Sequence, residues 1–196
     1  MNSLFTRFRR RWLAGFVSLV LPAFAQPAAA ASYDDFHVGT LKGKLIVQWW
    51  GPDKFLFLPD KADPLTFKRS GGETITPGRM FTDGGSIPRS LWIFRQYSPW
   101  GYAPAFIVHD WLFNMKHCGL PGNDKYNHEI AATIMAEVMK TMMETKMVDV
   151  AQLTLLAMYQ AVDSNVAKTY WDTGKCELPP TGLAAKKPLY EFKLSF

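Results

Sequence analysis

Hydrophobic and polar positions divide most of the chain into a half with strand patterning and a half with helical spacing. Between residues 41 and 81, short apolar runs are separated by Gly, Pro and Asp, which are turn-forming residues. The runs span residues 45–50, 55–58, 65–68 and 73–76. The last two flank Ser70, Gly71 and Gly72, as the strands of a hairpin flank its turn. This half therefore predicts a small antiparallel β-meander of three to five strands.

Apolar residues recur at three- and four-residue spacing from residue 86 onward, which indicates helices. Ser86 with Pro88 suits the start of a short helix, and Pro104 the start of a second, because Ser caps a helix and Pro is tolerated in its first turn. Longer helices are expected over residues 127–144 and 149–171. The inner face of the last one is expected to carry Leu153, Leu156, Ala157 and Val166. The predicted fold class is α+β, with the meander packed against a bundle of three to four helices.

Residues 189–196 alternate between apolar and polar side chains, which predicts one strand added at the edge of a sheet. We expect a single α+β domain over residues 32–178, a length sufficient for one hydrophobic core. A C-terminal tail over residues 179–196 would then contain the added strand.

The N-terminal region has the pattern of a cleaved signal peptide. Four arginines between residues 7 and 11 precede a short apolar stretch that ends near Ala25, and small residues follow to Ala31. The apolar stretch has about 14 residues, fewer than the roughly 20 that a membrane-spanning helix needs. We therefore expect residues 1–31 to be removed on export. The mature protein would be periplasmic or secreted, without a transmembrane span.

Removal of this leader changes the charge of the chain. The full sequence has 22 Lys and Arg against 17 Asp and Glu, and the four arginines of the leader leave a net charge of only +1 in the rest. A nearly neutral chain without a stripe of basic and aromatic residues lacks the electrostatic pattern of nucleic-acid binding. We therefore expect no nucleic-acid partner.

Cys118 and Cys176 are the two cysteines of the chain. An isolated pair of cysteines in an exported protein is more often bridged than free. We therefore expect a disulfide between them rather than a catalytic thiol at Cys118.

The candidate chemistry lies in two segments. His109 and Asp110 stand within the apolar run 105–113, where titratable groups need either partners or a chemical role. Residues 82–89 combine the carboxylate of Asp83 with two glycines and the predicted helix start. Neighbours on a helix point about 100° apart, so His109 and Asp110 are expected to border one cavity without bonding each other. We expect these two residues and Asp83 to form a catalytic site, with His109 as the general base.

Asp110 would need further ligands to hold a metal. The Asp83 carboxylate and the backbone carbonyls of Gly84 and Gly85 are hard oxygen donors, the kind that calcium prefers. Zinc would use His109 with the two carboxylates, but these residues lack a conventional zinc spacing. We expect calcium before zinc as a cofactor. A structural role stays open, in which Asp83 caps a turn and His109 is a satisfied core histidine.

Three segments of the chain resemble the bacterial and phage domain-of-unknown-function family 1353. They are residues 82–89 (TDGGSIPR), residues 109–113 (HDWLF) and residues 158–162 (MYQAV). The resemblance spans roughly residues 44–170 and implies no established reaction. Phe113 stands where that family usually has tyrosine, and Ala132 where an aspartate is frequent. The missing acid weakens any mechanism in which a second helix orients His109.

A glycine-bearing loop followed by a helical His-Asp pair is also similar, more loosely, to secreted phospholipases of the A-two class. That resemblance implies that His109 activates a water and that Asp110 binds calcium together with the carbonyls of Gly84 and Gly85. The chain lacks the dense disulfides of that class.

Two functions follow as hypotheses. The first is an exported hydrolase that cleaves an ester or phospholipid bond in a small-molecule or lipid substrate at His109, Asp110 and Asp83. The second is a non-catalytic envelope or phage-derived module that binds another partner, in which the same residues serve only the fold.

Overall fold

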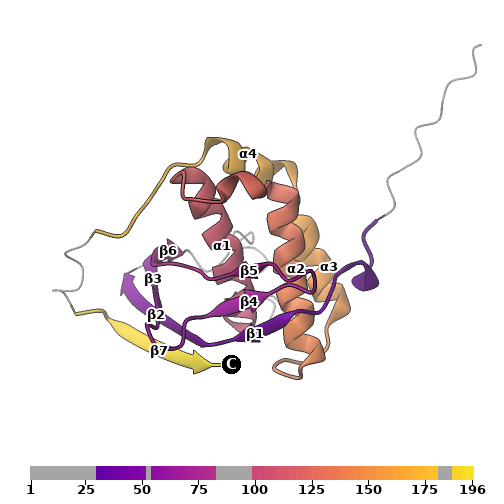
Figure 1. The fold of residues 1–196 in the computed structure, drawn as a ribbon, viewed down its shortest axis with the longest axis horizontal. Coiled ribbons are helices and arrows are strands. Elements are labelled where there is room, and N and C mark those ends of the chain that lie inside the picture. The colour runs from indigo at the N-terminus through magenta and orange to yellow at the C-terminus, as the bar shows by residue number, and fades with distance from the viewer. Residues whose placement is uncertain (1–29, 52–53, 83–98, 181–186) are drawn as a thin grey trace, which may run out of the picture. The chain divides into compact units, whose positions relative to one another are not determined.

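Two antiparallel β-sheets lie beside four helices in the part of the chain that the structure describes (Figure 1). The structure is a computed structural model, and it describes residues 30–51, 54–82, 99–180 and 187–196. The α+β class predicted from the sequence is confirmed, with the strands divided between two sheets. The predicted helix that begins at Ser86 lies outside the described residues, as do residues 1–29 of the expected leader.

The larger sheet has the strand order β6-β3-β2-β7. Its strands are β2 (Lys44–Gly51), β3 (Lys54–Pro59), β6 (Met80–Thr82) and β7 (Tyr190–Ser195). Leu45 and Val47 of β2 are fully buried, as period-two alternation on a half-buried strand requires. The alternating C-terminal residues form β7, which pairs antiparallel with β2 at the edge of this sheet.

The smaller sheet has the order β1-β4-β5 and consists of β1 (Thr40–Lys42), β4 (Thr66–Lys68) and β5 (Thr74–Ile75). The strands β4 and β5 form the predicted hairpin, with Phe67 opposite Ile75. Gly72 lies in their turn at a φ of +92°, a conformation that L side chains rarely adopt. The turn chemistry read from the sequence therefore sets this register.

The helices are α1 (Ala103–His117), α2 (His128–Glu144), α3 (Gln152–Val162) and α4 (Asn165–Thr173). The described residues also form short 3₁₀ helices: η1 (Tyr33–Asp35) precedes β1, η4 (Pro99–Tyr102) leads into α1, and η5 (Asn123–Lys125) joins α1 to α2. Asn127 caps α2 by accepting a hydrogen bond from the backbone N–H of Ile130 at 2.7 Å. No helix of the described residues is long and apolar enough to span a membrane.

The single helix predicted over residues 149–171 is wrong, because the chain breaks between α3 and α4. Ser164 caps α4 by accepting a hydrogen bond from the N–H of Ala167 at 3.3 Å. The predicted inner face is wrong with it, since Leu153 is 81% exposed and Val166 is 74% exposed. A cap in the middle of the run starts a new helix, so residues on either side no longer share one face. Met158 and Trp171 are buried instead.

An ion pair with a buried carboxylate, Glu137, joins the β4–β5 hairpin to α2. Arg69 donates from Nε to Glu137 Oε2 at 2.6 Å and from Nη2 to Oε1 at 3.0 Å. Its Nη1 also donates to Glu73 at 3.0 Å, and the Tyr126 hydroxyl donates to the same carboxylate at 2.8 Å. Burial and then this hydrogen bond raise the pKa of Tyr126 to about 12. The sheet and the helix are therefore held together by charges that have several partners each.

We expect Arg69→Met to lower the free energy of unfolding by about 3 kcal/mol, because it leaves the Glu137 carboxylate buried without its partner. Urea unfolding followed by circular dichroism measures this loss. Lys168→Met is the matched control, since it breaks an exposed i, i+4 pair with Asp172 that is expected to contribute less than about 0.5 kcal/mol. Equal losses in the two variants would contradict the importance of the pair between Arg69 and Glu137.

Candidate functional site

The imidazole of His109 lies in the core, on α1. The residue has no exposed surface, and its ring lies 4.7 Å from that of Phe113, one helical turn further on. His109 Nδ1 is 3.4 Å from Asp110 Oδ1. Our expectation that these helical neighbours do not hydrogen-bond each other is therefore wrong. The contact is at the long end of hydrogen bonding, and it places the ring against one side of the carboxylate.

The carboxylate of Asp110 joins α1 to β6. Thr82 Oγ1 donates a hydrogen bond to Asp110 Oδ2 at 2.6 Å, a short distance typical of a hydroxyl that faces a carboxylate. Thr82 is itself buried, and the Asp110 side chain is 13% exposed. The carboxylate thus has Thr82 on one oxygen, His109 on the other, and a remaining opening toward a cavity.

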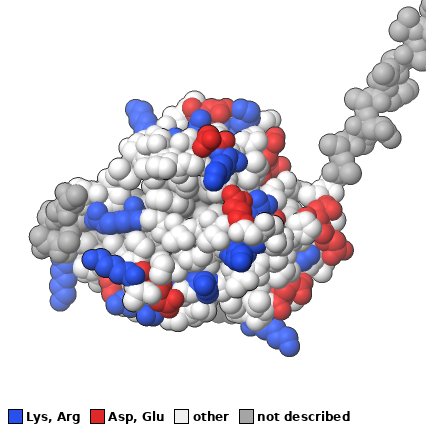
Figure 2. Space-filling model, in the orientation of Figure 1, with Lys and Arg blue, Asp and Glu red and all other residues white. Residues whose placement is uncertain are grey.

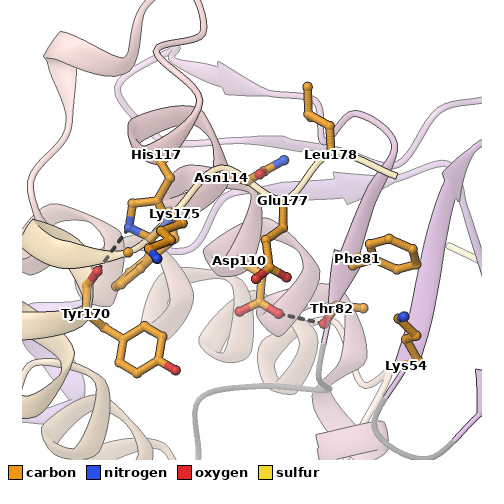
Figure 3. Close-up of a pocket in the computed structure, with 12 residues that line it drawn as sticks. Lys54, Phe81, Thr82, Asp110, Asn114, His117, Tyr170, Lys175, Glu177 and Leu178 are labelled. Atoms are coloured by element: carbon orange, nitrogen blue, oxygen red, sulfur yellow. Dashed lines mark hydrogen bonds between the residues drawn. The ribbon is translucent and has the colours of Figure 1, made fainter. Parts of the chain in front are cut away.

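This cavity has a volume of about 560 Å³. One face of α1 supplies Asp110, Phe113, Asn114 and His117, which are spaced i, i+3, i+4 and i+7 and so lie along one side of a helix. The strands β3 and β6 contribute Lys54, Phe81 and Thr82. Asp110 lines the cavity, with its carboxylate beside Thr82 (Figure 3), whereas His109 does not line it, so the carboxylate of the pair is exposed there and the imidazole is not.

Residues 174–178, which follow α4, form another wall of the cavity. This segment contributes Gly174, Lys175, Glu177 and Leu178, and Glu177 points from it toward Asp110 in the view of Figure 3.

The predicted disulfide is present, and Cys176 of this segment is bridged to Cys118 at the C-terminus of α1. His117 adds a second link, because its Nε2 lies 3.0 Å from the backbone carbonyl oxygen of Tyr170 in α4. A Cβ at Gly174 would overlap the His117 ring, so a larger residue there would require the ring to move.

Two buried nitrogen atoms at this site have no hydrogen-bond partner among the described residues, namely Nε2 of His109 and Nδ2 of Asn114. A buried polar atom without a partner destabilises the folded state by about 1–3 kcal/mol. Such atoms therefore call for a functional or structural explanation. Asn114 is one turn from Asp110, and its side chain lines the same cavity.

Three of the predicted site residues, Asp83, Gly84 and Gly85, lie outside the described residues. Of the four residues expected to bind calcium, the structure therefore places only Asp110. No group of three or more His, Cys, Asp or Glu side chains within the described ranges is arranged to hold a metal ion. One carboxylate does not make a calcium site, so calcium stays a prediction that involves the 83–85 segment, and no chemical step is assigned to it.

Sequence reasoning missed several residues of the cavity. Thr82 belongs to the motif at residues 82–89, but the sequence did not indicate that it hydrogen-bonds Asp110. The spacing of Asn114 from Asp110, one turn along a predicted helix, was a signal that could have found it. Lys175 and Glu177 flank Cys176, so the predicted disulfide could have placed them beside the C-terminus of α1. No local pattern marks Lys54, because β-sheet pairing alone brings it to the site.

The fold and cavity define an α+β protein with a carboxylate held at an opening between a helix and a sheet. The chain belongs to the family described as "Protein of unknown function (DUF1353)", whose model matches residues 62–162. The predicted family resemblance is thus confirmed. No curated protein and no solved structure matches the chain. The matched range contains Thr82, His109 and Asp110, whereas the 174–178 segment follows it.

We expect replacement of both cysteines, Cys118→Ser with Cys176→Ser, to lower the free energy of unfolding by about 4 kcal/mol. The bridge spans 58 residues, and the chain-entropy estimate for a loop of that length gives this magnitude. Urea unfolding of the oxidised protein and of the double variant measures the difference. Reduction of the wild-type protein should reproduce the loss, and a change below about 1 kcal/mol in both would contradict it.

Proposed function

We propose that this protein is an exported hydrolase that cleaves an ester bond in a small-molecule or lipid substrate, with Asp110 as the general base. The observation that carries the proposal is the position of Asp110 between the Thr82 hydroxyl, the His109 ring and the cavity. The cysteine pairing is compatible with an oxidising compartment, which supports export.

In the proposed step, Asp110 removes a proton from a water molecule in the cavity as the water oxygen attacks the ester carbonyl. The carbon–oxygen bond of the ester then breaks, and the leaving alcohol takes up the proton, so water is the only co-reactant. Lys54 and Lys175 bring positive charge to the cavity, where it would favour the negative charge that develops on the carbonyl oxygen. Phe81, Phe113 and Leu178 supply apolar walls for an acyl chain.

His109 acts in this proposal as a positioning residue. With its ring proton on Nδ1, the imidazole faces Asp110 Oδ1 as a donor while Thr82 donates to Oδ2. Two donors on opposite oxygens fix the orientation of the carboxylate. This arrangement reverses our initial assignment, in which His109 was the base, because the imidazole does not line the cavity.

A second candidate is a non-catalytic module that binds a ligand or partner in the same cavity. The observation that favours it is the complete burial of His109 against Phe113, as expected for a core anchor. Binding without turnover would then explain the cavity, and Asp110 would recognise a hydrogen-bond donor of the ligand.

The Asp110→Asn variant tests the hydrolase. It keeps the shape of the side chain and an oxygen for Thr82 but removes the base, so we expect ester turnover to fall by roughly 10²–10⁴-fold. Hydrolysis of p-nitrophenyl acetate and butyrate, and of phosphatidylcholine vesicles, by the purified protein provides the measurement. Asp124→Asn, on an exposed acid of η5, is the control and should keep wild-type turnover. Absence of wild-type turnover on all these substrates would overturn the hydrolase in favour of the binding module.

The His109→Phe variant tests the positioning role separately. Phenylalanine preserves a ring against Phe113 but removes the Nδ1 contact with Asp110, so we expect kcat to fall about tenfold or more while KM stays near its wild-type value. Steady-state kinetics and thermal unfolding are compared on the same samples. A lower melting temperature with unchanged kcat would show that His109 serves the fold alone.

A further inference from the structure

The strand β7 leaves one of its edges without a partner among the described residues. It pairs with β2 on one side, and the order β6-β3-β2-β7 places it at the end of the sheet (Figure 1). Five of its six residues are exposed. An open edge with this exposure is a template for pairing with another strand.

The direction of the backbone groups on β7 follows from its pairing with β2. The N–H of Phe196 donates to the carbonyl of Gly43 at 2.9 Å. These two residues are the next opposed pair after Lys44 and Ser195 in the register of β2 and β7. Because alternate residues of an antiparallel strand bond to the same neighbour, Tyr190, Phe192 and Leu194 bond toward β2. The N–H and C=O groups of Glu191, Lys193 and Ser195 therefore point to the open edge.

The side chains of β7 extend an apolar face beyond the core. Leu194 is opposite Leu45, and Tyr190 is opposite Trp49. Leu45 is fully buried, but Leu194 is 45% and Tyr190 64% exposed. The sheet thus presents apolar side chains beside unpaired backbone groups at this edge.

We propose that a second copy of this chain covers this edge, with β7 of one copy antiparallel to β7 of the other around Phe192. Such a twofold pairing places Glu191 of each copy opposite Lys193 of the other. These are the residues whose backbone groups point outward, so the same register also satisfies the backbone. Tyr190 then lies opposite Leu194, and the two four-stranded sheets become one continuous sheet.

Charge selects this register over its neighbours. In the paired strands, the N–H and C=O groups that point to the open edge of one copy must bond to those of the other copy. The neighbouring twofold registers that meet this condition are centred on Glu191 and on Lys193. The first places two glutamates opposite each other and the second two lysines, and like charges in directly opposed positions are destabilising. Figure 2 shows both signs of charge on the side of the molecule where Figure 1 places β7. Within one chain Lys193 Nζ already lies 3.1 Å from Glu191 Oε1, so the paired strands would form a four-charge cluster.

The dimer is independent of the proposed hydrolase, because no residue of β7 lines the cavity. Lys193→Glu would place glutamates opposite each other at both charged positions. The combined swap, Glu191→Lys with Lys193→Glu, restores both pairs with reversed signs. Lys61→Glu, on an exposed lysine of the loop after β3, makes the same charge change away from the edge.

Sedimentation equilibrium of the purified full chain, its Lys193→Glu variant, the swapped variant and the Lys61→Glu control tests the proposal. We expect a dimer for the wild type, the swap and the control, and at least a tenfold weaker association for Lys193→Glu. Circular dichroism verifies that each variant is folded. A monomeric wild type, a Lys193→Glu variant that associates like the wild type, or a swap that fails to restore association each overturns the proposed interface.

Discussion

The hydrogen bond from Thr82 to Asp110 is the interaction on which the site depends. It links the last residue of β6 to the middle of α1, so the larger sheet and the first helix meet at a charged group. A carboxylate with only partial exposure needs donors to offset its desolvation, and Thr82 supplies the shortest one. Without it, the same burial would favour a closed apolar contact between strand and helix. The Asp110 side chain lines the cavity and is 13% exposed, so the carboxylate is accessible from it.

The disulfide between Cys118 and Cys176 holds another wall of the cavity against α1. The 174–178 segment has no regular secondary structure, so nothing in its own backbone pattern fixes it beside α1. The bridge to Cys118 and the fit of Gly174 against His117 hold it there. The helix α1 is therefore anchored to the sheet at its middle, through Asp110, and to this segment at its C-terminus, through Cys118. The cavity lies between two anchors on one helix, which is why its lining follows a single helical face.

Local sequence patterns predicted most of the helices and strands, whereas the packing between them and the geometry of the site depend on long-range contacts. The hairpin around Gly72, the edge strand at the C-terminus and the helices around residues 103–117 and 128–144 follow periodicity and turn chemistry that the sequence displays directly. The break at Ser164 was missed although Asp163, Ser164 and Asn165 form a polar cluster of the kind that ends one helix and caps the next. Arg69 and Glu137 are 68 residues apart, so no local pattern could reveal that a helix buries this carboxylate against a hairpin. The sequence identified His109 and Asp110 as a candidate pair but did not predict how their side chains are placed. Two neighbours on a helix point in different directions, and the sequence does not say which of them reaches the cavity.

The proposed exchange of roles between His109 and Asp110 rests on which of the two side chains lines the cavity. A buried donor without an acceptor is costlier and rarer than a buried acceptor without a donor. With the ring proton on Nδ1, the unpartnered Nε2 of His109 is an acceptor, and the only ring N–H faces the carboxylate. His109 Nε2 has no partner among the described residues and does not line the cavity, so in the proposed function the ring supports the carboxylate and does not contact a substrate. Asp110, with its opening to the cavity, can accept a proton from a molecule there without moving. In the proposed function, the burial of His109 suits it to support the carboxylate beside it.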